Sequence, residues 1–163
     1  MPIHLTDEEI QSLVTEPKPV AKNWFSRLKP RPKPGHEETQ LDITGSQGSE
    51  FRVMIRKSLI NVLDFSVILG CCPKGSNVIF RLRRYNGKSH EHTNLIEKTS
   101  FYDFHIHEAT LRYQEIGLRE DFFANPTARY ADLDSAIHCL MADCNIKLPV
   151  PEPPPLLALL EGK

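Results

Sequence analysis

The sequence predicts an α+β fold in which one main helix covers an antiparallel sheet of about five strands, with a short helix at the N-terminus. Apolar and polar residues alternate over several short segments, which is typical of half-buried strands. Short turns separate most of these segments, and this favours antiparallel neighbours over the long crossovers of a parallel sheet. One segment near the C-terminus instead has the spacing of an amphipathic helix.

Length and charge limit the classes of function that the chain can serve. Its 163 residues match the usual size of one domain. The net charge is -1, so binding to nucleic acid would depend on a local basic face. The first ten residues lack the apolar core of a secretion signal, and no apolar run approaches the roughly 18 residues of a membrane span. We therefore expect a cytoplasmic protein without a membrane partner.

The chain divides by composition into four parts. They are an N-terminal helix in residues 1–16, a proline-rich basic connector in 17–38, an α+β domain in 39–147 and a proline-rich tail in 148–163. Thr6 and Glu9 have the spacing of a capping box, which predicts where the first helix begins. The prolines of the connector favour extended backbone, so this part is either mobile or lies along the edge of the sheet.

Five segments of the central part are expected to form strands. They are residues 40–44, 51–57, 62–69, 77–84 and 101–107. Residues 85–100 are expected to form a longer loop, and residues 108–116 a short helix. Residues 132–144 carry apolar side chains at helical spacing, and this helix is expected to cover the apolar side of the sheet.

Alternation then fixes which side chains share the opposite, polar face of the sheet. The polar set of these strands is Arg52, Arg56, Asp64, Ser66, Arg81, Arg83, Asp103, His105 and His107. Arginine holds phosphate oxygens through paired hydrogen bonds, and histidine exchanges protons near neutral pH. The face is therefore expected to be locally basic on a nearly neutral protein.

Such a face suits the cleavage of RNA without a metal, which needs a base, an acid and cations. We assign the catalytic roles to His105 or His107, with Asp103, Glu108 or Asp64 as the acidic partner. The predicted residues for binding nucleic acid are Arg52, Arg56, Arg81, Arg83, Arg84 and Lys88. The alternative is an ordinary solvated face, because antiparallel sheets often leave one polar side in water.

Two His-x-His pairs raise the separate hypothesis of a metal site. His90 and His92 lie in the predicted loop, and His105 and His107 lie on a predicted strand. Residues two apart on a strand point the same way, so such a pair can chelate one ion. We expect no cofactor, and zinc held by these four imidazoles is the alternative.

Several runs of the sequence carry a family resemblance. The runs LTDEEIQSLV, FRVMIRKS, VIFRLRRYNGKSHEH, FYDFHIHEA and DCNI together resemble an uncharacterised bacterial family of single-domain proteins, over residues 5–146. More distantly, the chain is similar to the TumE-type toxins of bacterial toxin–antitoxin loci. That similarity maps onto Arg81, Arg84, His90, His105 and His107. It implies a function directed at nucleic acid and an antitoxin as a protein partner.

Two hypotheses of function follow from these observations. The first is a protein of bacterial or phage origin directed at RNA or DNA, in the form of an RNA-cleaving toxin or a phage-defence factor. The second is a binding or inhibitory module without catalysis. It would contact a protein partner through the polar face of the sheet and through the C-terminal tail.

Overall fold

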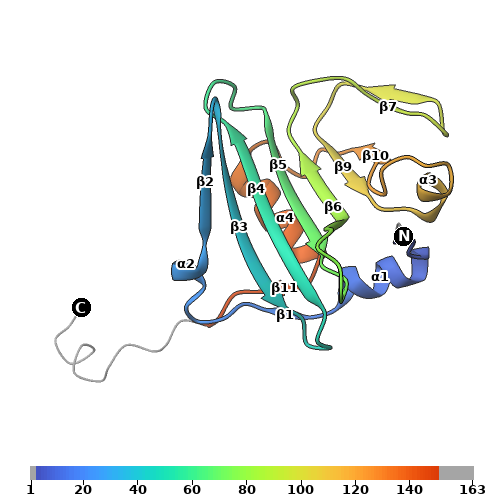
Figure 1. Ribbon diagram of the computed structural model, residues 1–163. Coiled ribbons are helices and arrows are strands. Elements are labelled where there is room, and N and C mark those ends of the chain that lie inside the picture. The colour runs from blue at the N-terminus through green and yellow to red at the C-terminus, as the bar shows by residue number, and fades with distance from the viewer. Residues whose placement is uncertain (1–2, 151–163) are drawn as a thin grey trace, which may run out of the picture.

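A seven-stranded antiparallel sheet forms the centre of the protein, whose structure is a computed structural model that describes residues 3–150 (Figure 1). The strand order is β10-β9-β6-β5-β4-β3-β2, and every neighbouring pair is antiparallel. Two smaller sheets accompany it: β1 pairs with β11 in parallel, and β7 pairs with β8 as an antiparallel hairpin. The predicted α+β fold with an antiparallel sheet is confirmed, although the main sheet has seven strands instead of about five.

The described chain contains the following elements. The helices are α1 (Asp7–Thr15), α2 (Trp24–Arg27), α3 (Leu111–Glu115) and α4 (Leu133–Asp143). The first six strands are β1 (Lys18–Pro19), β2 (Lys29–Lys33), β3 (His36–Thr44), β4 (Glu50–Ser58), β5 (Phe65–Cys71) and β6 (Phe80–Asn86). The remaining strands are β7 (His92–Asn94), β8 (Thr99–Phe101), β9 (His105–Glu108), β10 (Ala124–Pro126) and β11 (Ile146–Lys147).

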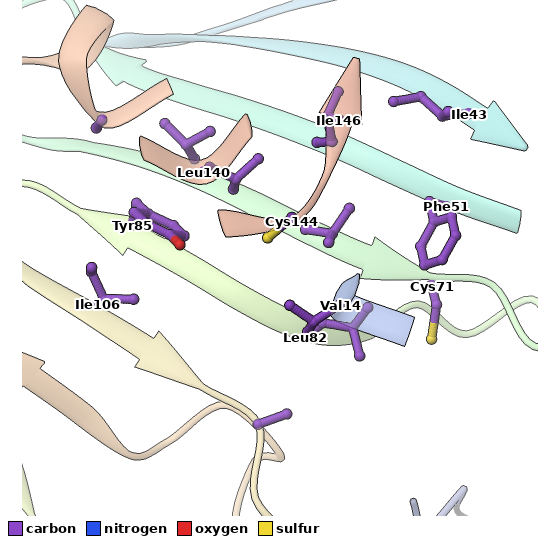
Figure 2. Close-up of a cluster of buried hydrophobic side chains, with 14 of the residues drawn as sticks. Val14, Ile43, Phe51, Cys71, Leu82, Tyr85, Ile106, Leu140, Cys144 and Ile146 are labelled. Atoms are coloured by element: carbon purple, nitrogen blue, oxygen red, sulfur yellow. The ribbon is translucent and has the colours of Figure 1, made fainter. Parts of the chain in front are cut away.

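Helix α4 packs on one face of the sheet, behind the central strands in the view of Figure 1. The helix meets the apolar side of β5 and β6, where Leu140 and Cys144, the residue that caps the helix, are buried near Tyr85 (Figure 2). Helix α1 closes the same core near β6, where Val14 lies beside Leu82 (Figure 2). The predicted capping box of α1 is present, since Thr6 and Glu9 each accept a hydrogen bond from the other's backbone amide.

One buried lysine joins the ends of two helices. The ammonium of Lys18 donates to the carbonyl oxygens of Leu13, Val14 and Glu16, at 2.8, 2.8 and 2.9 Å, and to that of Cys144 at 2.7 Å. These carbonyls belong to the C-terminal ends of α1 and α4, which cannot be satisfied within the helices themselves. Burial lowers the pKa of Lys18 to about 8, so it still carries its charge at neutral pH.

The proline-rich connector supplies the edge of the sheet. Of the two alternatives for residues 17–38, the edge position is the one observed, because β2 pairs with β3 and has no other neighbouring strand within residues 3–150. Pro30 and Pro32 lie within β2. A proline cannot donate to a further strand, so it is tolerated at an edge and blocks further pairing there. The predicted tail begins at residue 148, and residues 151–163 lie outside the described part of the chain.

The prediction of a loop over residues 85–100 is wrong. This segment continues β6 to Asn86 and then forms the β7–β8 hairpin. The two strands of the hairpin are only three residues long, too short for an alternating pattern to be recognised in the sequence.

None of the helices within residues 3–150 is long and apolar enough to cross a membrane.

Candidate functional site

A bulge in β6 decides which of its arginines reach the polar face. Leu69 pairs with Arg83 and Gly70 pairs with Arg81, so Leu82 is an extra residue without a partner. Beyond the bulge the alternation is reversed. Arg83 therefore lies on the side of α4, and Arg84 lies on the polar side with Arg81. The prediction that Arg83 shares the polar face is wrong for this reason.

The two strand histidines do share the polar face with Arg84. His107 pairs with Arg84 across β6 and β9, and His105 pairs with Asn86. Both imidazoles are buried, with exposed fractions of 0% for His105 and 3% for His107. Glu108 pairs with Arg83 and so faces the side of α4, which makes its predicted role as their acidic partner wrong.

The β7–β8 hairpin brings two further imidazoles onto the same face. The ring centroid of His92 lies 4.9 Å from that of His107 and 5.6 Å from that of His105. The ring of His90 lies 5.6 Å from that of His105. His105 and His107 are themselves 4.9 Å apart. We call these four histidines, together with Arg84, the imidazole site.

Backbone carbonyls fix the tautomers of the two strand histidines. Nδ1–H of His105 donates to the carbonyl of Asp103 at 2.8 Å, and Nδ1–H of His107 donates to the carbonyl of Asp121 at 2.8 Å. Each ring is thereby left with a lone pair on Nε2. Asp103 thus contributes its backbone oxygen, while its side chain is exposed. The remaining predicted acid, Asp64, is paired with Arg56.

Asn86 links His105 to the neighbouring strand. Its amide nitrogen lies 3.4 Å from Nε2 of His105, and its amide oxygen accepts a hydrogen bond from the hydroxyl of Ser66 at 2.9 Å. The orientation of the Asn86 amide is thereby set, so its NH₂ group faces the imidazole. His105 is held from both ring nitrogens, whereas the fixed tautomer of His107 leaves Nε2 able to act on a ligand.

The hairpin histidine His92 is held in the opposite tautomer. Its Nε2 donates to the side-chain oxygen of Asn94 at 2.9 Å, and that amide also bonds both backbone groups of Ala124, at 3.0 and 2.7 Å. Nε2 of His92 therefore points to Asn94 and is not available to hold a ligand together with the other three histidines. Within residues 3–150 no group of three or more histidine, cysteine or acidic side chains is arranged to hold a metal ion.

Burial keeps the strand imidazoles neutral. The pKa of His107 is lowered to about 2, mainly by burial away from solvent and next by the positive charge of Arg84. Loss of solvent also lowers the pKa of His105 to about 4, with smaller contributions from the neighbouring histidines and Arg84. An anion placed beside Arg84 would oppose these effects and raise both pKa values. Binding of an anion at this position and proton uptake by the imidazoles would therefore favour each other.

Two cavities open on the imidazole site and share a wall. One cavity of about 380 Å³ is lined by His92, His107, Arg119 and Phe122, together with other residues of the hairpin. A second cavity of about 280 Å³ is lined by Arg56, Asp64, Phe65, Ser66, Asn86, Gly87 and Ser89. Arg84 and His90 line both of them. A ligand that spans the two cavities would therefore pass directly over the guanidinium of Arg84.

One buried carboxylate holds the cations of the site. Asp121 has an exposed fraction of 0%, and its oxygens lie 3.1 Å from Nε of Arg84 and 3.3 Å from Nη2 of Arg119. Two guanidinium groups therefore share this single carboxylate. The backbone of the same residue fixes the tautomer of His107, so Asp121 positions both the cation and the imidazole.

The rest of the polar face is less basic than the sequence predicts. The other arginines predicted to bind nucleic acid on this face are each paired with a carboxylate: Arg52 with Asp42, Arg56 with Asp64, and Arg81 with Glu120. Lys88 follows Gly87 after the end of β6, where its backbone amide donates to the carbonyl of Leu63. Arg84 differs from these arginines because it shares its carboxylate, Asp121, with a second guanidinium, that of Arg119.

Sequence reasoning missed three residues that contact the imidazole site. Asp121 and Arg119 lie in a segment of irregular structure between α3 and β10, where no periodic pattern marks them. Asn86 lies just beyond the predicted end of its strand at residue 84, although Asn86 and Gly87 together are a visible turn signal.

Comparison with known proteins finds no matching family model, no matching curated protein and no matching solved structure.

Proposed function

We propose that the protein cleaves RNA at the imidazole site without a metal ion, as a toxin or defence factor would. The observation that carries the proposal is the shared wall of the two cavities. A guanidinium, Arg84, and an exposed imidazole, His90, both line this wall, and His107 faces one of the cavities with a fixed tautomer. These are the cation and the proton-exchanging groups that phosphodiester cleavage requires.

Each residue has a distinct role in this mechanism. Arg84 binds the scissile phosphate through charge-assisted hydrogen bonds. Nε2 of His107 takes the proton of the 2′-hydroxyl, and the bound phosphate makes this imidazole more basic than it is in the empty site. The 2′-oxygen then forms a bond to phosphorus as the bond from phosphorus to the 5′-oxygen breaks, which leaves a cyclic phosphate. His90, which lines both cavities, donates a proton to the leaving 5′-oxygen. Asp121 positions Arg84 and His107.

The test is cleavage of a labelled single-stranded RNA by purified protein that carries no histidine tag, in the presence of a chelator. We expect cleavage to persist with chelator and to fall about 10²- to 10⁴-fold in His107→Ala, because one positioned acid or base supplies about that factor. His138→Ala is the matched control, since His138 is exposed on α4, on the other side of the sheet. Intact RNA with the unmodified chain, or equal rates in both variants, would reject the proposal.

Loss of cleavage on adding chelator would favour the metal hypothesis instead. The four histidines would then have to rearrange on metal binding, since His92 is turned toward Asn94. Metal content of the purified protein separates the two explanations, because a structural or catalytic ion is retained near one equivalent per chain.

A non-catalytic binding module is the second candidate. The ion pairs between the arginines of the polar face and nearby carboxylates favour it. Arg52, Arg56 and Arg81 each have a carboxylate partner, and Arg84 and Arg119 share one, which suits a protein partner better than a long phosphate backbone. A salt series on RNA affinity distinguishes the candidates. Contacts to about two phosphates predict a slope of about -1.4 in log affinity against log salt, whereas a flat response would indicate a protein partner.

A further inference from the structure

The sheet is wider than the helix that covers it. Helix α4 contacts mainly β5 and β6, so the apolar side of β3 and β4 is only partly covered. The result is a groove of about 350 Å³ between α4, β3, β4 and the segment that carries α2. Its lining includes partly buried apolar side chains of the core, namely Trp24, Leu41, Val53, Ile55, Ile137 and Met141.

The end of the described chain lies at this groove. Leu148 is one of the lining residues and has an exposed fraction of 49%, and Val150 two residues later has an exposed fraction of 86%. Apolar side chains exposed beside an open apolar groove indicate that more of the surface is covered in the complete chain or in a complex.

The sequence that follows offers a matching occupant. Residues 156–160 read Leu-Leu-Ala-Leu-Leu, and four leucines suit a lining that is mainly aliphatic. Six residue steps separate Val150 from Leu156, and an extended chain covers about 20 Å in that number of steps. The 11 residues of α4 span about 16 Å, so this reach covers the length of the helix that borders the groove.

We propose that residues 156–160 of the same chain occupy the groove between α4 and β3. Attachment through a short linker gives the segment an effective concentration of about millimolar, which no separate peptide at cellular concentration would match. The segment would thereby complete the core over β3 and β4, on the opposite side of the sheet from the imidazole site. The inference does not depend on the proposed function.

The single tryptophan of the chain makes the proposal measurable. Trp24 is the only tryptophan among 163 residues, and it lines the groove. The experiment compares the fluorescence of the full chain with that of the full chain carrying Leu157→Asp and Leu160→Asp. We expect the emission of the double variant to shift to longer wavelength and its quenching by acrylamide to increase. Glu161→Gln is the matched control and should leave both unchanged.

Four further outcomes decide the proposal. Addition of a synthetic peptide of residues 151–163 to the double variant should reverse the shift in a saturable manner. Identical emission from the double variant and the control would overturn the proposal, as would a peptide without effect. A shift that depends on protein concentration, together with elution of the unmodified chain as a dimer, would assign the groove to a second copy and would also overturn it.

Discussion

Replacing Lys18 with methionine is expected to lower the free energy of unfolding by about 3–5 kcal/mol. Four buried carbonyls would each lose a donor worth about 1–3 kcal/mol, and the removal of a buried charge would offset part of that loss. Methionine keeps the length and apolar character of the side chain, so the loss reports the ammonium group. The effect is large because the four acceptors come from the ends of both α1 and α4. Urea unfolding at pH 7 measures it.

The matched control is Lys74→Met, since Lys74 is exposed in the turn between β5 and β6. A surface change of this kind alters stability by less than about 0.5 kcal/mol. If both variants unfold at the same urea concentration, Lys18 does not join the two helices in the way described. The same outcome would leave the burial of this lysine without a structural reason.

Replacing Asp121 with asparagine is expected to cost about 3–5 kcal/mol, which is typical when one partner of a buried ion pair is removed. The change keeps the shape of the side chain and removes the charge that compensates Arg84 and Arg119. The freed guanidinium groups should then bind anions more strongly. We therefore expect inorganic phosphate to restore part of the lost stability in a urea titration.

Asp42→Asn provides the comparison for this variant. Asp42 pairs with Arg52 at 2.8 Å, but 42% of its side chain is exposed, so the pair contributes only about 0–1 kcal/mol. The two variants differ in burial and not in the kind of interaction removed. Equal losses of stability, or no effect of phosphate on the Asp121 variant, would contradict the role assigned to the buried carboxylate.

The alternation of apolar and polar residues predicted most of the sheet, because side chains two residues apart on a strand point to the same face. Phe65, Val67 and Leu69 lie on the core side as the pattern predicts, and His105 and His107 share one buried face. The pattern fails in β6, since one inserted residue reverses every side chain that follows. Nothing in the sequence of β6 distinguishes Leu82 as that residue. The sequence therefore could not show that Arg84, and not Arg83, lies on the polar face.

The site itself depends on contacts between residues far apart in the sequence. The His-x-His pairs were visible, but their approach depends on a hairpin whose strands are three residues long. Asp121 acts through its burial and through its backbone carbonyl, and neither property leaves a mark in the sequence. The neutralisation of the basic face likewise depends on carboxylates such as Asp42 and Glu120, which come from other parts of the chain.

We expect His105 and His107 to be neutral, with Nε2 as the lone-pair nitrogen, and an anion at Arg84 to make both more basic. Nuclear magnetic resonance of the imidazole nitrogens across pH 5 to 8 tests this expectation directly. Without anion, we expect His107 to stay neutral and protonated on Nδ1 throughout this range, because its pKa is lowered to about 2. His105, with a pKa near 4, should behave in the same way.

With inorganic phosphate, both titrations should move upward in pH, and Arg84→Gln should abolish that movement. Assignment of each signal by single replacement with asparagine identifies the two residues. Titration of both imidazoles near the ordinary value of about 6.5, with no response to phosphate, would contradict the account.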